Sequence, residues 1–251
     1  MTCTTMPDTP AAVHAHCRVR LARLDAVTVT GHDWLGDDEA TRLAAMTSPD
    51  RRRSFLAGHW LARELAADWL QVESRRITLQ RHDDGRPLLL LDGRACALSL
   101  SISHSGDWLA VALANVPVGV DVELPRRQRD LDALARFAFS PEEAQRLQDL
   151  PEVERSTAFH LLWALKEARG KRSGEGILPA RSRQVTAIPS SADAAEAISW
   201  QLGEGALVLA VDAGTVVSVE TSETPGLPQF WRYSQASGAS SASTGDAHSI
   251  A

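Results

Sequence analysis

The sequence predicts an α+β fold in which two halves follow a similar plan. Segments with alternating apolar and polar residues occur near both ends and in the middle of the 251-residue chain. Two long segments carry apolar residues at helical spacing, and the order of strand, helix and strands occurs twice, without a residue-level repeat. We expect the first half to span residues 1–115, the second 116–222, and residues 223–251 to form a disordered tail.

The composition is that of an ordinary globular protein and excludes several classes. Apolar residues make up 44% and charged residues 23% of the chain, which is long enough to bury a core without disulfides or structural metals. No apolar run reaches the roughly 18 residues of a membrane span, and the first ten residues lack the layout of a secretory signal, so we expect a cytoplasmic protein. The net charge of −6 argues against nonspecific nucleic-acid binding, although a local basic patch can still hold phosphates.

The first half begins with a strand and a long helix. Apolar and polar residues alternate over 13–21, which is typical of a half-buried strand. Ser48 and Pro49 form a helix start, and apolar residues then recur at helical spacing as far as Trp69. Over 77–114 short apolar segments alternate with turns, and we expect a meander of strands there.

The second half repeats this order. Residues 118–123 alternate as a strand, helical segments follow around 139–143 and over 158–171, and strand-like segments lie at 206–212 and 215–220. From about Thr221 the chain becomes poor in large apolar residues and ends in a tract of Ser, Ala and Gly. Such a segment cannot bury enough apolar surface to order itself, which predicts the tail.

The strand at 118–123 carries two carboxylates on one face. Its valines point to one side, while Gly119, Asp121 and Glu123 point to the other. Positions two apart on a strand are separated by about 6.6 Å, so both carboxylates can reach a common ion. Oxygen ligands without a nearby His or Cys favour Mg²⁺, which completes its coordination with water and substrate phosphate. The alternative is a solvated polar face on an amphipathic strand.

The helix at 158–171 places a third carboxylate and a lysine on one face. Helical spacing brings Glu167 and Lys171 to the same side as His160 and Trp163. Glu167 can complete a cluster of three carboxylates while Lys171 neutralises a bound phosphate; the alternative is a surface ion pair worth about 0.3–0.5 kcal/mol. Gly170 costs about 1 kcal/mol against Ala inside a helix, which indicates close approach of a ligand or a fraying helix end.

The basic residues are almost all arginine. Of the 26 lysines and arginines only Lys166 and Lys171 are lysines, and they lie five positions apart. Such clustering indicates a site that requires a compact ammonium rather than a planar guanidinium. The alternative is coincidence on a solvated helix face.

Further segments have the chemistry of anion sites. Arg51, Arg52 and Arg53 lie in the first turn of the first long helix, where the helix dipole disfavours cations unless an anion binds there. The turn at 85–87 carries another cation, and His104 lies at the end of a predicted strand beside a loop. Solvated arginines and a structural histidine are the alternative interpretations.

Together these motifs resemble those of the surfactin-type 4′-phosphopantetheinyl transferases. The resemblance covers roughly residues 48–178 and rests on GRP at 85–87, SISHSGDWLAVAL at 101–113, VGVDVE at 118–123, FSPEE at 139–143 and WALKEARGKRSGEGI at 163–177. The most specific element is the pairing of G-V-D-V-E with W-x-x-K-E-A-x-x-K about forty residues later.

The resemblance implies two similar α/β halves related by a pseudo-twofold axis, with coenzyme A bound between them. It implies Mg²⁺ held by Asp121, Glu123 and Glu167. The implied catalytic residues are Glu167, as general base, and Lys171 and His104, on coenzyme phosphates. The implied coenzyme-binding residues are Arg51, Arg52, Arg53, Arg63, Gly85, Arg86, Pro87, Ser103, His104, Asp121 and Lys171.

The activity that the resemblance implies is Mg²⁺-dependent transfer of 4′-phosphopantetheine from coenzyme A to a serine of an apo acyl or peptidyl carrier protein, with release of adenosine 3′,5′-bisphosphate. We expect a monomer that activates carriers of polyketide, nonribosomal peptide or fatty acid synthases and binds neither nucleic acid nor membrane. Two alternatives stay open: a noncatalytic module that binds coenzyme A or a carrier, and a metal-dependent phosphohydrolase that uses the same acidic cluster.

Overall fold

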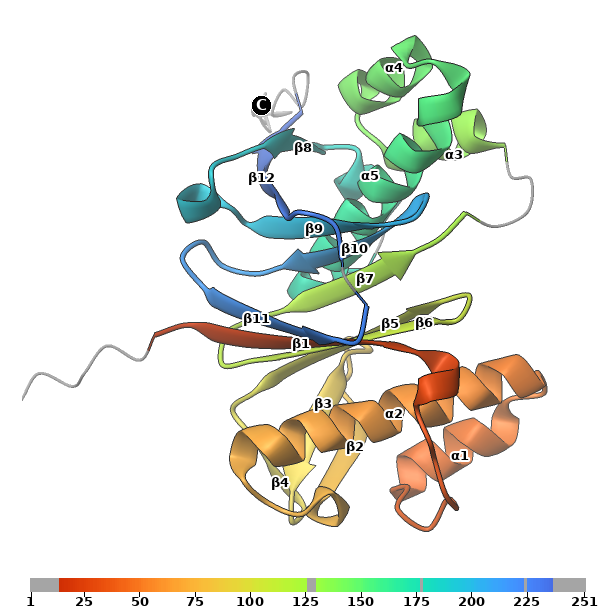
Figure 1. The fold of residues 1–251 in the computed structure, drawn as a ribbon, viewed down its shortest axis with the longest axis vertical. Helices are drawn as coiled ribbons and strands as arrows, with labels where there is room; N and C mark the ends of the chain where they lie inside the picture. The colour runs from red at the N-terminus through yellow and green to blue at the C-terminus, as the bar shows by residue number, and fades with distance from the viewer. Residues whose placement is uncertain (1–13, 126–129, 177, 224, 237–251) are drawn as a thin grey trace, which may run out of the picture.

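Each half of the molecule is built on a β-sheet and one helix of 22 residues (Figure 1). The structure is a computed structural model that describes residues 14–125, 130–176, 178–223 and 225–236. The mixed α+β architecture with two halves confirms the fold class expected from the sequence.

The first half contains the predicted strand, helix and meander. Its elements are β1 (His16–Arg23), α1 (Asp37–Ala45), α2 (Pro49–Leu70), β2 (Ile77–Arg81), β3 (Pro87–Leu91), β4 (Arg94–Ala95), β5 (Ser99–Ser105) and β6 (Trp108–Ala114). The hydroxyl of Ser48 caps α2 by accepting from the Arg51 amide at 3.4 Å. Helix α2 then buries Leu61 and Leu65 in a core shared with Leu109 and Val111 of β6.

Helix α1 was not expected from the sequence. Only Glu39 and Leu43 of its nine residues are buried, so it shows no apolar stripe. The Glu39 carboxylate accepts from the Gly36 amide at 3.0 Å and holds the start of the helix. The same carboxylate binds His59 and Arg63 of α2, so contacts with charged residues distant in sequence also hold α1.

The first half has a three-stranded sheet of order β2-β3-β4 and a four-stranded sheet that includes a strand from the end of the chain. The order of the four-stranded sheet is β11-β1-β6-β5, and β11 (Val216–Thr221) pairs in parallel with β1. Glu220 of β11 forms ion pairs with Arg18 and Arg20 of β1 at 2.5 and 2.8 Å. A segment expected to belong to the second half thus completes the sheet of the first.

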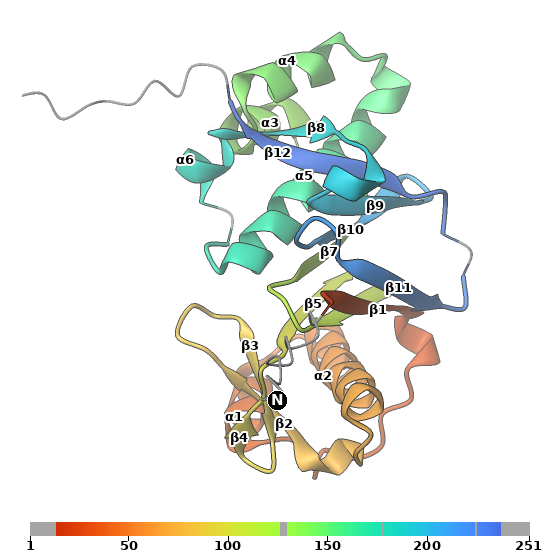
Figure 2. The ribbon, with the colours of Figure 1, turned by 90° about the vertical axis from the view of Figure 1, so that its left-hand side faces the viewer.

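The second half packs a five-stranded sheet against α5. Its elements are β7 (Gly119–Glu123), α3 (Leu131–Ala138), α4 (Pro141–Asp149), α5 (Glu152–Ser173), α6 (Pro179–Ser182), β8 (Val185–Pro189), β9 (Ala197–Leu202), β10 (Gly205–Ala210) and β12 (Gln229–Gln235), with sheet order β7-β10-β9-β12-β8. Helix α5 lies against this sheet (Figure 2). Ala164, Leu165 and Ala168 of α5 are buried in the core between them.

Strand β12 corrects the expectation that residues 223–251 are disordered. Residues 229–235 pair with β8 and β9, and residues 237–251 lie outside the described part of the chain. Two aromatic residues hold the strand: Trp231 Nε1 donates to Ser199 Oγ at 2.9 Å, and the Tyr233 hydroxyl donates to the Leu165 carbonyl at 2.8 Å. Because Ser, Ala and Gly dominate the composition after Thr221, this short aromatic segment was not expected to form a strand.

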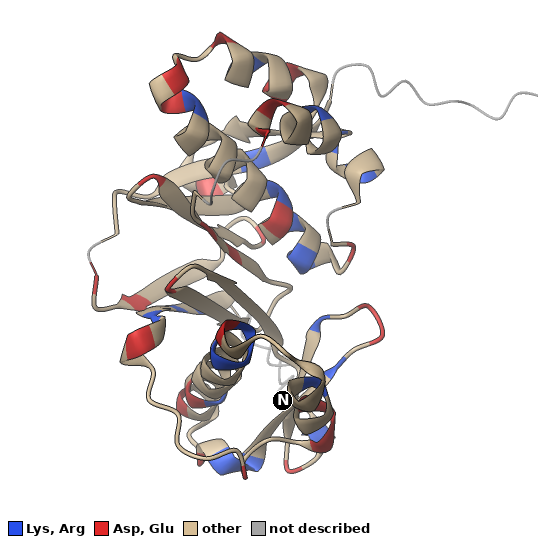
Figure 3. Ribbon diagram, turned by 90° about the vertical axis from the view of Figure 1, so that its right-hand side faces the viewer, with Lys and Arg blue, Asp and Glu red and all other residues tan. Residues whose placement is uncertain are grey.

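One apolar core joins the two sheets. Val118, Val120 and Val122 are buried in it together with alternate residues of β1, β6 and β10, which confirms the predicted alternation of β7. In the view of Figure 3 basic and acidic residues are interspersed over both halves. Neither of the two 22-residue helices, nor another described helix, combines the length and the apolar content that a bilayer span requires.

Candidate active site

The candidate site depends on the close contact between β7 and α5. Gly119 of β7 faces α5, and a Cβ atom there would collide with the carbonyl oxygen of Ala168. Any side chain at this position would push the helix away from the strand. Because Asp121 lies two residues further along β7, it faces the same helix, at the turn that carries Glu167 and Lys171.

Gly170 of α5 serves a second close backbone contact. A Cβ atom there would collide with the carbonyl oxygen of Gly176, whose amide donates to the Gly170 carbonyl at 3.1 Å. The helix continues to Ser173, so Gly170 does not mark a fraying end. This glycine lets the chain fold back over the helix beside Lys171.

Asp121 is buried and has two donors on one of its oxygens. Its Oδ1 atom accepts from Ser103 Oγ at 2.8 Å and from Lys171 Nζ at 2.7 Å. Lys171 also donates to the Val120 carbonyl at 3.1 Å, which fixes its ammonium on β7. The Oδ2 atom of Asp121 is buried without a hydrogen-bond partner. A buried, unpaired carboxylate oxygen is costly unless a cation or donor joins it.

Glu167 lies one helical turn before Lys171 and is half-buried. Burial raises the pKa of its carboxyl group, the negative charge of Asp121 raises it further, and Lys171 lowers it in part. Two carboxylates and an ammonium therefore interact here; the helical spacing predicted that Glu167 and Lys171 share one face. A raised pKa makes the Glu167 carboxylate a stronger base.

The third predicted carboxylate, Glu123, ends β7 and is half-buried. Among the residues that the structure describes, no three His, Cys, Asp or Glu side chains are grouped closely enough to hold a metal ion. The donors nevertheless fit Mg²⁺ chemically, because Asp121 offers an unpaired buried oxygen and Glu167 a second carboxylate destabilised by that charge. The structure does not group all three carboxylates as it stands, and their joint coordination of one ion stays a prediction.

Lys166, the other lysine, lies outside this site. Its ammonium is buried and donates to Glu143 Oε2 at 2.8 Å, to the Ser182 carbonyl at 3.0 Å and to the Val185 carbonyl. Burial lowers the pKa of Lys166, and Glu143 opposes that effect. Three acceptors around one nitrogen match the three donors of an ammonium, whereas a planar guanidinium would not fit them.

A cationic pocket lies on the other face of β5. It has a volume of about 280 Å³, and none of its described lining residues carries a carboxylate. Its charged and titratable lining residues are Arg42, Arg51, His59, Arg81 and His104. Gly85 and Pro87 of the predicted turn also line it. Arg42 pairs with Asp38 at 3.8 Å, but the lining as a whole carries three guanidinium groups and no carboxylate, which favours an anion in this pocket.

The three consecutive arginines have different environments. Arg51 lines the cationic pocket. Arg52 donates to the carbonyls of Leu43 and Met46 at 2.5 and 3.3 Å and so caps the end of α1. Arg53 lines a separate cavity beside β1. Of this trio, the structure brings only Arg51 next to His104.

Two other predicted binding residues are engaged elsewhere. Arg63 is fully buried, pairs with Glu39 and lies over the ring of Trp34. Arg86 lies outside the cationic pocket; it pairs with Asp84 at 2.6 Å and donates to the Arg172 carbonyl at 3.2 Å. Arg86 therefore ties the β2–β3 turn of the first half to the end of α5.

The predicted residues Ser103 and His104 lie on opposite faces of β5. Ser103 is buried and faces Asp121, whereas His104 lines the cationic pocket. Sequence reasoning did not identify Arg42 or Arg81 as binding residues. Arg81 directly precedes the turn that carries Gly85 and Pro87, so the hairpin pattern contained a signal for it; Arg42 belongs to the unexpected helix α1.

A buried charged cluster supports the wall of the cationic pocket. Glu39 accepts from His59 Nδ1 at 2.5 Å and from Arg63 Nη1 at 2.9 Å, and the His59 ring stacks on Phe55. Burial alone would raise the pKa of Glu39, but hydrogen bonds from His59 and Arg63 and the charge of Arg63 outweigh it and lower the pKa to about 2. Burial lowers the pKa of His59, which favours the neutral imidazole.

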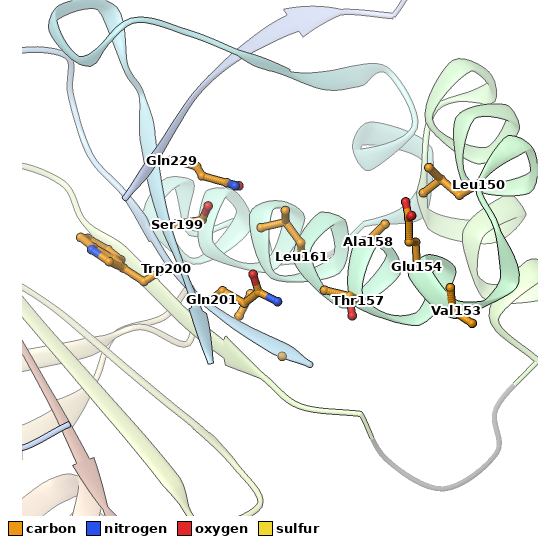
Figure 4. Close-up of a pocket in the computed structure, with 12 residues that line it drawn as sticks. Leu150, Val153, Glu154, Thr157, Ala158, Leu161, Ser199, Trp200, Gln201 and Gln229 are labelled. Carbon is orange, nitrogen blue, oxygen red and sulfur yellow. The ribbon is translucent and has the colours of Figure 1, made fainter. Parts of the chain in front are cut away.

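A larger groove lies away from these residues. It has a volume of about 480 Å³ and lies between the first turns of α5 and strands β9, β10 and β12 (Figure 4). None of the site residues predicted from the sequence lines it, and its one charged lining residue is Glu154. The chemistry described above is therefore not located in this groove.

Two family models match adjacent parts of the chain. The model described as the 4′-phosphopantetheinyl transferase superfamily matches residues 117–212. The model described as the N-terminal part of 4′-phosphopantetheinyl transferase matches residues 30–116.

Individual relatives have the same description. The chain is 30% identical over 202 residues to 4′-phosphopantetheinyl transferase HetI of Nostoc sp., a match that covers 79% of this chain and 83% of HetI. It is 30% identical over 166 residues to 4′-phosphopantetheinyl transferase Sfp of Bacillus subtilis, covering 60% and 71%. A match of 33% identity to 4′-phosphopantetheinyl transferase psf-1 of Bacillus pumilus spans 51% of this chain and 52% of psf-1.

The Glu39 cluster predicts an acid-sensitive contribution to stability. Because the pKa of Glu39 is about 2 in the folded protein and 4.5 without these contacts, its contribution is complete above pH 4.5 and is lost as the pH falls towards 2. We expect the free energy of unfolding of the wild type to fall by about 3 kcal/mol more than that of Glu39→Gln between pH 5 and pH 2. Denaturant unfolding at several pH values measures this difference, and parallel curves would contradict it.

Proposed function

The chain belongs to the 4′-phosphopantetheinyl transferase superfamily and is a transferase that acts on carrier proteins, and on this premise we propose the reaction and its residues. The 4′-phosphopantetheine group moves from coenzyme A to a serine of an apo acyl or peptidyl carrier protein. Adenosine 3′,5′-bisphosphate leaves, and Mg²⁺ is required. The observation that carries this proposal is the buried, unpaired Oδ2 atom of Asp121, whose Oδ1 atom binds Lys171 and whose charge acts on Glu167.

Asp121 and Glu167 would hold the Mg²⁺ ion, with Glu123 as a further candidate ligand. When bound, the ion stabilises negative charge on the coenzyme's pyrophosphate. Lys171 is already fixed beside Asp121 and can place its ammonium against the same phosphates. Phosphoryl-type transfer needs mainly such positioning and charge stabilisation from the protein.

Glu167 would act as the general base. The carrier serine oxygen forms a bond to the β-phosphorus of coenzyme A, and the bond from that phosphorus to the bridging oxygen of the leaving bisphosphate breaks. The proton of the serine hydroxyl moves to the Glu167 carboxylate. Burial and the Asp121 charge raise the pKa of Glu167, whereas a Mg²⁺ ion held by the same carboxylates would lower it, so the place of Glu167 beside Asp121 and Lys171 supports this assignment.

The cationic pocket would bind the nucleotide end of coenzyme A. Its three arginines supply positive charge for the 3′-phosphate of the coenzyme, and His104 lines the same pocket. Arg51 and Arg81 are the proposed phosphate contacts, and Gly85 and Pro87 of the turn line the same pocket. Arg52, Arg53, Arg63 and Arg86 have the structural environments described above, so we do not assign them to the coenzyme.

We also propose that the two halves meet near residues 115 and 116. The two family models meet at residues 116 and 117, which supports this boundary, and β11 crosses it by returning to the first sheet. The cytoplasmic location, the monomeric state and the class of synthase stay predictions.

The transfer reaction is tested by mass spectrometry of apo carrier proteins incubated with the chain, coenzyme A and Mg²⁺. We expect a phosphopantetheine mass gain on the carrier, and loss of the base in Glu167→Gln should lower kcat/KM by about 10²- to 10⁴-fold. Glu154→Gln, which removes an exposed carboxylate from the same helix, should leave turnover unchanged.

Three results would contradict this account. They are no mass gain on any of several carriers, coenzyme A cleavage at the same rate without a carrier, and equal turnover of wild type and Glu167→Gln. Thermal unfolding of both variants shows whether they are folded.

The coenzyme pocket is tested with Arg51→Ala and its matched control Arg53→Ala, both near the start of α2. Losing a charge-assisted hydrogen bond costs about 1.5–3 kcal/mol, so Arg51→Ala should raise the KM for coenzyme A by roughly 10- to 100-fold. Arg53→Ala should stay within about twofold of wild type, since Arg53 lines a different cavity. With dephospho-coenzyme A, which lacks the 3′-phosphate, wild type and Arg51→Ala should have similar KM values. The assignment would be refuted if Arg51→Ala raised the KM for dephospho-coenzyme A as much as the KM for coenzyme A. It would also be refuted if Arg51→Ala and Arg53→Ala raised the KM for coenzyme A equally.

A further inference from the structure

The two sheets meet along a ladder of serine hydroxyls. Strands β5 and β7 are the facing edge strands of the two sheets (Figure 1). Along β5, every second residue is a serine whose Oγ accepts from a backbone amide of the β7 segment. The pairs are Ser99 with Val118 at 3.1 Å, Ser101 with Val120 at 3.0 Å, Ser103 with Val122 at 3.3 Å and Ser105 with Leu124 at 3.1 Å.

The serine hydroxyls of this ladder accept hydrogen bonds from the backbone amides on the free edge of β7, in place of the carbonyl groups of a neighbouring strand. The amides of Val118, Val120 and Val122 point away from β10 and would otherwise be buried donors without an acceptor. Because side chains alternate along a strand, the serines at alternate positions of β5 all face β7. A hydroxyl that accepts one hydrogen bond still has one proton to donate.

Ser103 donates that proton to the candidate metal ligand. Its Oγ lies 2.8 Å from Asp121 Oδ1, and the serine is 6% exposed, so its bonds are shielded from water. The second donor to Oδ1, Lys171, has a side chain that is 28% exposed. Ser103 comes from the first half and Lys171 from the second, and together they fix the rotation of the carboxylate. The other oxygen, Oδ2, is left buried and unpaired.

We propose that Ser103 is a positioning residue for Asp121, and that it does not bind the coenzyme directly. Its hydroxyl accepts from β7 and donates to Oδ1, which turns Oδ2 towards the ligand. Docking of the two halves along the ladder thereby sets the geometry of the metal ligand. This inference rests on the proposed Mg²⁺-dependent transfer. It differs from the expectation that Ser103 contacts coenzyme A, because its single proton is already committed to Asp121.

The test compares Ser103→Ala with Ser101→Ala. Both variants remove one rung of the same ladder, but Asp121 accepts from Ser103 and not from Ser101. Each should lower the thermal unfolding midpoint by a similar amount, roughly 2–4 °C. Only Ser103→Ala should weaken Mg²⁺ binding to the coenzyme complex, measured by calorimetric titration, by about tenfold or more. Ser101→Ala should stay within about twofold, and Ser103→Thr, which keeps the hydroxyl, should recover most of the affinity.

The kinetic readout separates positioning from coenzyme binding. Ser103→Ala should raise the half-saturating Mg²⁺ concentration while leaving the KM for coenzyme A at saturating Mg²⁺ within about twofold. Equal metal affinities of the two alanine variants, or a raised KM for coenzyme A at saturating Mg²⁺, would overturn the inference. Should Ser103→Ala fail to fold, Ser103→Cys, whose thiol is a weak donor, takes its place with the same expectations. If the wild type itself shows no transfer or no Mg²⁺ dependence, the proposed function fails instead.

Discussion

The contact between Gly119 and the carbonyl of Ala168 is the constraint on which the site depends. It brings the backbone of α5 against β7, and because Asp121 is two residues from Gly119, the same helix presents Glu167 and Lys171 to it. Gly170 permits the chain to return over the helix immediately afterwards. Two glycines with no chemistry of their own therefore determine which charged groups can interact. A helix held even a methyl group further from the strand would separate the ammonium from the carboxylate.

The distribution of charge follows from which acceptors surround each cation. Lys166 and Lys171 each donate to several carbonyl or carboxylate oxygens from a single nitrogen. A compact ammonium fits such a set of acceptors. Arginines occupy the sites where a planar group bridges several acceptors, as Arg63 does with Glu39, and the sites that line the cationic pocket. An acidic protein thus concentrates positive charge where the coenzyme is proposed to bind. The acidic charges of the site lie on the other face of β5.

Local patterns predicted the parts of the site that lie on single elements. The alternation of 118–123 placed Asp121 on the face opposite the valines, and helical spacing placed Glu167 and Lys171 together. Features that depend on distant partners were missed. From the sequence Arg63 looks like a binding residue, but in the fold it pairs with Glu39 of the unexpected helix α1. Strand β12 depends on hydrogen bonds from Trp231 to β9 and from Tyr233 to α5. The alternating serines of β5 predicted a strand. That their hydroxyls accept from the amides of β7 became clear only from the meeting of the two sheet edges.

The most direct test of the account is the position of the metal ion. A crystal of the wild-type chain with coenzyme A and Mn²⁺, which prefers the same oxygen ligands as Mg²⁺, gives an anomalous difference peak at the ion. We expect the peak within bonding distance of Asp121 Oδ2, with Glu167 bound to the ion directly or through one water and the coenzyme phosphates beside Lys171. A peak that contacts neither Asp121 nor Glu167, with coenzyme phosphates bound elsewhere, would contradict the central claim.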